Sequence, residues 1–493
     1  MEKVVKEEEY LKYMDNGKDF IDDEKILREI EKNKDPDPAR IREIMAKSMD
    51  IQTLSPDETA ALLNVESPSL WEEIYETAAA IKRKVYDNRV VTFAPLYCSN
   101  YCVNNCLYCG FRRDNKEEVR RRLTIEEVKE ETKVLAGKIG HKRLIVVYGE
   151  HPLSDAKYIA DTIQAIYSVK VKTKKGYGSI RRVNVNAAPM SVEDLRMLKE
   201  IGIGTYQVFQ ETYHHETYKK VHPFGTLKSN YQWRLYSMHR AFEAGVDDVA
   251  IGALFGLYDW RFEVMGLLYH ALELENRFGV GPHTVSFPRL TPAKNAPYVQ
   301  NTRYTVSDED FKKLIAVIRL SIPYTGMIIT AREPAKVREE VLAMCTQTDA
   351  STRIGIGDYS QSFNKDSQDL SKQQFLIGDS RELDDVVREL AVKGYITSFC
   401  TAGYRCGRTG KNIMELLKTG KEGSFCKLNA ILTFREWLDD FASESTKAVG
   451  EELIRREMEE VKNQTPRSYS PGVIKELENY YERIKDGERD LYF

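Results

Sequence analysis

The segment VVTFAPLYCSNYCVNNCLYCGFR, residues 90–112, contains four cysteines and joins a run rich in β-branched residues to a cysteine-rich loop. Further short β-branched runs follow along the chain, and amphipathic helical patterns separate them. The predicted strands are residues 90–93, 143–147, 182–186, 205–209, 248–253, 284–287, 326–330 and 352–356. The predicted helices are residues 125–138, 156–169, 192–201, 232–244, 261–278, 308–320 and 335–344. This alternation predicts an α/β fold, a parallel (β/α)8 barrel of the TIM type.

Two further regions flank the predicted barrel, which we place at residues 86–379. Residues 1–85 are charged and follow helical patterns, so they predict an N-terminal helical extension. Residues 380–493 do not continue the alternation of strands and helices. They predict a separate, mostly helical C-terminal domain that carries three of the cysteines.

Charge and hydropathy exclude several classes of protein. The chain has 493 residues, and 73 Lys and Arg against 76 Asp and Glu leave a net charge of −3. That balance argues against electrostatic binding of nucleic acid. The apolar runs fall well short of the roughly 20 residues that a membrane span needs, and the charged N-terminus lacks a secretory signal. We therefore expect no nucleic-acid or membrane partner and a cytoplasmic location, where eight cysteines do not form a disulfide framework.

Cys102, Cys106 and Cys109 follow the first predicted strand with the spacing C-x3-C-x2-C. A structural zinc site normally takes four protein ligands, so three cysteines leave one metal position open. Such a loop can wrap three thiolates around one iron–sulfur cluster, and an open iron can chelate a small molecule. The alternatives are three free cysteines grouped by chance and a scaffold protein that holds zinc. Cys98, at the end of the strand, is interpreted as a structural thiol.

This loop resembles the signature of the radical S-adenosylmethionine (SAM) superfamily. The resemblance implies a 4Fe-4S cluster on the three cysteines, with SAM bound to the fourth iron and cleaved to a 5′-deoxyadenosyl radical. It also implies that Tyr108 packs near the adenine and that Gly149 and Glu150 receive the methionyl amino group. A carboxylate suits an ammonium group, although Glu150 also fits a position beside a helix N-cap.

Five longer stretches are similar to one group within that superfamily, the HydG family of radical tyrosine lyases that mature FeFe-hydrogenase. They are GHKRLIVVYGEHP at 140–152, GIGTYQVFQETYHHETYKKVHPFG at 202–225, IGALFGLYDWRFEV at 251–264, GVGPHTVSFPRLTPA at 279–293 and TGMIITAREP at 325–334. The likeness covers essentially the whole chain. The related 2-iminoacetate synthases of thiamine synthesis end soon after the barrel, so the extension from about residue 380 favours the maturase family.

The resemblance implies cleavage of the Cα–Cβ bond of L-tyrosine into p-cresol and dehydroglycine. In the family the dehydroglycine fragment travels down the barrel and becomes carbon monoxide and cyanide on iron at a second site. The implied partners are L-tyrosine, an electron donor such as ferredoxin or flavodoxin, and other hydrogenase maturases.

Catalytic side chains of such barrels lie at the carboxyl ends of the strands. Glu211 ends the fourth predicted strand, while Gly252 and Phe255 lie around the end of the fifth, where we expect close backbone approach to the adenine. Arg332 ends the seventh strand and Ser351 starts the eighth. In related aromatic amino acid lyases such an arginine and serine hold the substrate carboxylate, which a guanidinium can grip with two parallel hydrogen bonds.

Two alternatives stay open for this carboxylate site. Arg332 also fits a surface ion pair with the neighbouring Glu333. Arg289, at the end of the sixth predicted strand, is a second candidate for the substrate carboxylate. The sequence alone does not decide between them.

The C-terminal cysteines depart from the family pattern. The family binds a second iron–sulfur cluster through C-x2-C-x22-C, and in this chain those positions are Cys400, Gly403 and Cys426. Cys406 stands nearby, where the family does not normally use a cysteine. Either Cys400, Cys406 and Cys426 form a rearranged C-x5-C-x19-C site, or the second cluster is lost or weakened and the reaction stops at dehydroglycine.

His283 opens the sixth predicted strand instead of ending it, so we expect it at the mouth of the barrel opposite the first cluster. A lone histidine in a strand is more often a core residue with satisfied hydrogen bonds. The family resemblance instead implies that His283 helps to hold an additional iron beside the second cluster.

Overall fold

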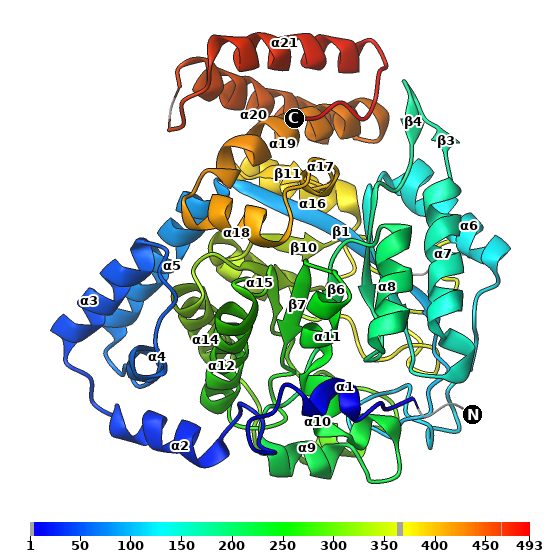
Figure 1. Ribbon diagram of the computed structural model, residues 1–493. Helices are drawn as coiled ribbons and strands as arrows, with labels where there is room; N and C mark the ends of the chain where they lie inside the picture. The colour runs from blue at the N-terminus through cyan, green and yellow to red at the C-terminus, as the bar shows by residue number, and fades with distance from the viewer. Residues whose placement is uncertain (1–3, 362–367, 465) are drawn as a thin grey trace.

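The computed structural model describes residues 4–361, 368–464 and 466–493, and its strands close into a ring (Figure 1). The strands of the ring are β1 (Arg89–Ser99), β2 (Arg143–Tyr148), β5 (Arg182–Asn186), β6 (Tyr206–Gln207), β7 (Val249–Gly252), β8 (Thr284–Ser286), β9 (Gly326–Ile329) and β10 (Gln347–Asp349). All of their pairings are parallel, and β10 pairs with β1 through Gln347 and Val91. The predicted (β/α)8 barrel is therefore confirmed.

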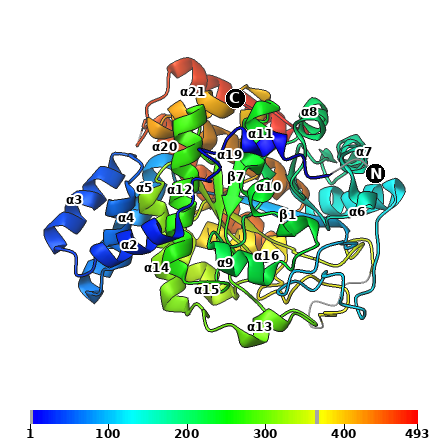
Figure 2. The ribbon, with the colours of Figure 1, turned by 60° about the horizontal axis from the view of Figure 1, so that its bottom comes forward.

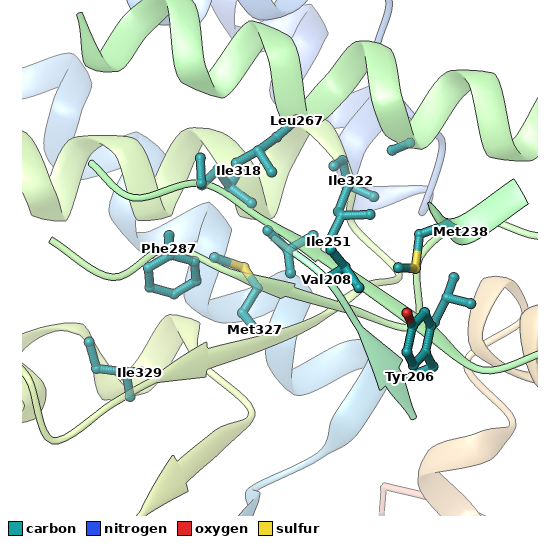
Figure 3. Packing of buried hydrophobic residues seen from close by; sticks show 14 of the residues in the cluster. Tyr206, Val208, Met238, Ile251, Leu267, Phe287, Ile318, Ile322, Met327 and Ile329 are labelled. Atoms are coloured by element: carbon teal, nitrogen blue, oxygen red, sulfur yellow. The ribbon is translucent and has the colours of Figure 1, made fainter. Parts of the chain in front are cut away.

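Helices cover the outer face of the ring. They are α6 (Ile125–Val134), α7 (Ala156–Ser168), α8 (Val192–Ile201), α10 (Tyr231–Leu235), α11 (Ser237–Glu243), α12 (Trp260–Phe278), α14 (Asp308–Ser321) and α15 (Ala335–Val341). In Figure 3, Val208, Ile251 and Met327 from the ring gather with Leu267 of α12 and Ile318 of α14 in one buried cluster. Each such side chain contributes about 1.5–3 kcal/mol when it is fully buried, so this layer holds the strand ends in fixed positions.

The predicted eighth strand at residues 352–356 is wrong. The chain pairs with β1 and β9 within Gln347–Asp349, turns at Ser351 with φ 51°, and then continues as a loop. Thr352 and Ile354 of this loop form part of the wall of the central cavity and pair with no described strand. A short apolar run does not distinguish these two uses.

The N-terminal extension consists of helices attached to the outer layer of the barrel. They are α1 (Glu8–Leu11), α2 (Asp23–Lys32), α3 (Pro38–Met49), α4 (Pro56–Leu63) and α5 (Pro68–Tyr86). The side chain of Ser55 accepts a hydrogen bond from the backbone N–H of Glu58 and so caps α4, and Ser67 caps α5 in the same way. α4 packs against α12, and α5 packs against α14 (Figure 1).

The C-terminal extension covers the amino ends of the barrel strands. Its elements are α16 (Leu383–Val392), β11 (Ile396–Ser398), α17 (Ala402–Arg405), α18 (Gly410–Lys418), α19 (Glu422–Asp440), α20 (Glu444–Lys462) and α21 (Pro471–Lys485). β11 pairs in parallel with the first residues of β1, with Ile396 opposite Arg89, so the sheet continues into the extension. Figures 1 and 2 show these helices at the end of the barrel opposite the cysteine loop. In the described ranges, no helix is long and apolar enough to cross a membrane.

Candidate active site

The cysteine loop leaves the carboxyl end of β1 and is held by backbone hydrogen bonds to neighbouring loops. The N–H of Val103 donates to the carbonyl oxygen of Glu150 at 2.8 Å, and the N–H of Leu107 donates to that of Val221 at 3.0 Å. Cys98, inside the strand, is fully buried, and burial raises the pKa of its thiol to about 12. The backbone bonds fix the loop over the carboxyl mouth, and the environment of Cys98 suits a structural thiol.

The three cysteines of the C-x3-C-x2-C motif are free thiols that line one cavity of about 220 Å³ at this mouth. Burial raises the pKa of Cys102 to about 11 and that of Cys106 to about 12, so these side chains are neutral thiols in the absence of a cation. Iron supplies the positive charge that converts a buried thiol into a thiolate ligand. Within the described residues no three Cys, His, Asp or Glu side chains already form a metal-binding group. The donor set itself, three free thiols on one loop facing one cavity, fits a cluster held by three cysteines.

Gly149 and Glu150 follow β2 directly and lie against the cysteine loop. A Cβ atom at Gly149 would lie 2.2 Å from the carbonyl oxygen of Tyr101, so only glycine permits this close approach. The carboxylate of Glu150 lines the cavity and accepts a hydrogen bond from Nδ2 of Asn104 at 2.5 Å. Burial raises the pKa of Glu150, although Arg234, Asn104 and Lys228 act in the opposite direction. The carboxylate is thus available for a cationic group of a ligand.

Tyr108 lines the cavity and is positioned by a buried histidine that the sequence pattern did not single out. The hydroxyl of Tyr108 and Nε2 of His222 lie 2.8 Å apart. Nδ1 of His222 lies 3.0 Å from the carbonyl oxygen of Tyr218, so Nδ1 carries the ring proton and Nε2 accepts from the tyrosine hydroxyl. Burial lowers the pKa of His222 well below its usual value, so the ring remains neutral.

Glu211 lines the same cavity as part of a charged cluster. Its Oε1 lies 2.7 Å from Nζ of Lys228 and 3.3 Å from Nη2 of Arg234. Burial alone would raise the pKa of Glu211, but Lys228 and Arg234 lower it, and the carboxylate is ionised. Neither cation was predicted, because no local motif connects them to Glu211.

Arg332, which follows β9, points into the cavity without an acidic partner. Its guanidinium lies 3.3 Å from the centre of the Phe375 ring, and its Nη1 donates to Oγ1 of Thr291 at 3.4 Å. In the part of the chain that the structure describes, Arg332 forms no ion pair with a carboxylate. Glu333 instead accepts from Nε of Arg289 at 3.0 Å, so the alternative of an Arg332–Glu333 surface pair is wrong.

Four of the remaining predicted residues do not face this cavity. Arg289 is occupied by Glu333 and by Asp308, whose Oδ1 lies 2.8 Å from its Nη1. Ser351 donates from its hydroxyl to Oε2 of Glu382 at 2.5 Å and accepts from the N–H of Leu383 at 2.8 Å, so it caps α16. Gly252 and Phe255 are not among the lining residues. Thr352, which follows Ser351, and Leu254, which precedes Phe255, line the cavity instead.

A second pocket lies at the amino mouth, under the C-terminal extension, and we call it the far pocket. Its lining includes Cys400, Gly403 and Cys426 together with Arg89 and Arg408. Cys406 does not line it: this thiol is exposed, and its Sγ lies 3.5 Å from the carbonyl oxygen of Phe493. The rearranged set of three cysteines is therefore not brought together, and the residues present do not fit a cluster held by three thiolates.

His283 lies at the same end of the barrel as the far pocket but does not line it. Its Nδ1 lies 3.1 Å from Oδ2 of Asp248, and its ring centre lies 6.5 Å from that of Tyr404 in α17. Burial would raise the pKa of Asp248, but His283 and Arg182 lower it to about 2. The hydroxyl of Tyr404 donates to the same carboxylate, so Asp248 connects His283 of the barrel to α17 of the extension.

Comparison with known proteins agrees with this geometry. Residues 96–264 match the Radical SAM superfamily, and residues 286–396 match the Biotin and Thiamin Synthesis associated domain. A crystal structure of HydG, a maturase of the [FeFe]-hydrogenase, superposes with a TM-score of 0.89 at 47% identity over 96% of this chain and 100% of that one. This chain belongs to the HydG family of radical SAM enzymes. The HydG of Carboxydothermus hydrogenoformans is also similar, with a TM-score of 0.78 and 36% identity over 93% of this chain and 97% of its own.

The curated relatives of this HydG-family chain include 2-iminoacetate synthases. That of Salmonella typhimurium is 29% identical over 355 residues, which are 71% of this chain and 87% of the relative. With both groups as relatives, the chain is a radical SAM lyase of the tyrosine-lyase group. The HydG structures match nearly the whole chain, whereas the 2-iminoacetate synthase leaves more than a quarter of it unmatched.

Proposed function

We propose that this enzyme cleaves the Cα–Cβ bond of L-tyrosine and releases p-cresol and dehydroglycine. The observation that carries the proposal is the guanidinium of Arg332, which forms no ion pair with a described residue and lies in the cavity that the three motif cysteines also line. A cation in such a cavity selects an anionic substrate, and the carboxylate of an amino acid matches its two parallel N–H donors.

Different side chains of the cavity would bind the cluster, SAM and the substrate. Cys102, Cys106 and Cys109 would hold a 4Fe-4S cluster, which with bound SAM supplies a 5′-deoxyadenosyl radical that takes a hydrogen atom from the substrate. Glu150 would bind the ammonium group of SAM, because its buried carboxylate accepts a hydrogen bond from Asn104 and forms no ion pair with a described residue. Arg332 would orient tyrosine by its carboxylate, which determines the hydrogen atom that faces the radical.

The loop at residues 374 and 375 packs against both the cysteine motif and Arg332. Gln374 donates to Sγ of Cys109 at 3.4 Å, and the ring of the adjacent Phe375 lies against Arg332. A low-dielectric cavity strengthens the interaction between Arg332 and a carboxylate, and it protects a reactive radical from side reactions.

A second candidate function differs in the fate of dehydroglycine. In the HydG family this fragment is converted to carbon monoxide and cyanide on iron, with other hydrogenase maturases downstream and a ferredoxin or flavodoxin as electron donor. The far pocket of this chain presents two thiols and leaves Cys406 outside. That observation favours an enzyme whose reaction stops at dehydroglycine.

The proposal is tested by product analysis of anaerobically reconstituted protein. With SAM, a reductant and L-tyrosine, the wild type is expected to yield 5′-deoxyadenosine and p-cresol. Cys106→Ala is expected to yield neither, because the cluster loses one of its three ligands. Cys345→Ala, which changes a buried cysteine outside the cavity, serves as the matched control and should retain both products. The absence of p-cresol from wild-type protein that cleaves SAM would contradict tyrosine as the substrate.

A further inference from the structure

The far pocket keeps the charge environment of a cluster site while it lacks one ligand. We infer that residue 403, and not Cys406, is the position at which a third thiol would complete this site, and that the chain as it stands binds no cluster there. The inference does not depend on tyrosine cleavage, which takes place at the opposite mouth of the barrel.

The first supporting observation is a pair of buried arginines without acidic partners. The side chains of Arg89 and Arg143 are 5% and 2% exposed, and Arg89 lines the far pocket. Among the described residues neither guanidinium forms an ion pair, and Nε of each is buried without a hydrogen-bond partner. A buried cation is normally paired, because transfer of an unpaired charge out of water is costly. The two carboxylates of the lining are already paired, Glu422 with Arg408 and Asp490 with Arg181 and Arg405. Arg89 and Arg143 are therefore left for an anionic occupant, and a cluster with thiolate ligands is anionic.

The second observation is the position of Cys400 among buried arginines. Cys400 and Arg89 line the same pocket, and Nη1 of the buried Arg182 donates to the carbonyl oxygen of Cys400 at 3.5 Å. Neighbouring cations favour a metal-binding thiolate over an inert buried thiol.

The third observation concerns the space at Gly403. This residue lies in the short helix α17 and lines the far pocket together with Cys400 and Cys426. A Cβ atom built at Gly403 would meet nothing closer than the carbonyl oxygen of Arg408 at 3.7 Å. The backbone at position 403 therefore leaves room for the Cβ atom of a cysteine.

Cys406 lacks these properties. It follows the last residue of α17, its thiol is exposed, and its Sγ faces the carbonyl oxygen of Phe493 instead of the pocket. Cys406 would therefore have to give up its contact with Phe493 and turn toward the pocket before it could act as a ligand. The two thiols that remain are too few for a cluster that the family holds with three.

The test counts iron and sulfide in chains whose first cluster has been removed. A Cys102→Ala, Cys106→Ala, Cys109→Ala triple variant, reconstituted anaerobically, is expected to be colourless and to bind no stoichiometric iron. Addition of Gly403→Cys should give about four irons and four sulfides per chain, with broad absorption near about 400 nm and a cluster signal in electron paramagnetic resonance. Gly472→Cys, which adds a thiol at an exposed position outside the pocket, is the matched control and should add no iron.

A parallel measurement in the intact chain avoids dependence on the folding of the triple variant. There, Gly403→Cys should raise the iron content from about four to about eight per chain. Cys406→Ala should change the iron content of neither the wild-type chain nor the Gly403→Cys chain. A triple variant that binds a cluster which Cys406→Ala removes would overturn the inference in favour of the rearranged site. A folded Gly403→Cys chain without additional iron would overturn it as well. Neither measurement uses p-cresol formation, so failure here is distinct from failure of the proposed lyase activity.

Discussion

Arg332 combines two properties that a receptor for a substrate carboxylate requires. It lines the cavity of the motif cysteines, and its guanidinium is held by an aromatic ring and a hydroxyl group instead of a carboxylate. Burial lowers its pKa from the usual value, yet an arginine remains charged throughout the range in which proteins work. The free energy of substrate binding can therefore come from pairing a cation that has no carboxylate partner among the described residues.

At this scale we predict that Arg332→Ala weakens binding of L-tyrosine by about 1.5 to 3 kcal/mol, the range for hydrogen bonds to charged groups. This corresponds to roughly a 10- to 150-fold higher Kd, measured by calorimetric titration in the presence of SAM. Formation of 5′-deoxyadenosine without p-cresol should persist. Arg332→Lys keeps the charge but loses the planar pair of donors, so its affinity for L-tyrosine should lie between those of the wild type and Arg332→Ala. Unchanged affinity in Arg332→Ala would remove this residue from the substrate site.

At the scale of elements, the contact between the end of β2 and the cysteine loop sets the position of the cluster ligands. Gly149 follows β2 and touches the backbone at Tyr101, and Val103 bonds to the backbone of Glu150. The two loops are thus joined through backbone atoms on both sides of Cys102. A side chain placed between them must move the loop as a whole, since backbone cannot adjust by changing a rotamer.

We therefore predict that Gly149→Ala costs about 1–3 kcal/mol of stability, as overpacking in a close-packed site does, and that it displaces the cysteine loop. The expected results are a lower melting temperature and reduced iron content after reconstitution. Gly472→Ala is the control, because its nearest neighbour would lie 4.0 Å away, at Oγ of Ser470. A Gly149→Ala protein with the iron content and melting temperature of the wild type would show that the two loops separate freely.

At the scale of the whole molecule, a buried ion cluster connects the C-terminal extension to the barrel. Oε2 of Glu436 in α19 lies 2.7 Å from Nη2 of Arg181 and 3.1 Å from Nζ of Lys142, which immediately precede β5 and β2. These side chains are 4% exposed or less. Burial would raise the pKa of Glu436, but Arg181 and Lys142 lower it to about 2. The carboxylate thus holds two buried cations that the barrel alone would leave unpaired.

Glu436→Gln is predicted to destabilise the protein by about 3–5 kcal/mol at pH 7, the usual cost of breaking a buried ion pair. Because the folded pKa of about 2 lies below the usual 4.5, the stabilisation by Glu436 is complete above pH 4.5 and is lost as the pH falls toward 2. The difference in melting temperature between wild type and variant should be constant from pH 7 to 5 and should narrow below pH 4.5. Glu444→Gln, an exposed acid at the start of α20, is the control and should change little. A difference that widens on acidification would contradict this assignment.

The sequence by itself determined the barrel, the cluster loop and the gap in the second site. The alternation of strand and helix patterns and the C-x3-C-x2-C spacing are local features, which can be recognised without knowledge of the rest of the fold. The glycine at position 403 indicates a gap only because the resemblance to the family implies a cysteine there. The carboxyl-end position of Glu211 and Arg332 followed from strand order alone, since parallel strands of a barrel end at one mouth.

Only the tertiary structure decided which side chains meet at that mouth. Lys228 and Arg234 reach Glu211 from 17 and 23 residues further along the chain, and no spacing rule connects them. Ser351 does not face the cavity, because the eighth strand, β10, ends at Asp349, before the predicted range of 352–356. Cys406 has a spacing that permits a ligand, yet its thiol faces the C-terminus. Strand register and loop path determine these directions, and both arise from long-range packing that residue spacing does not encode.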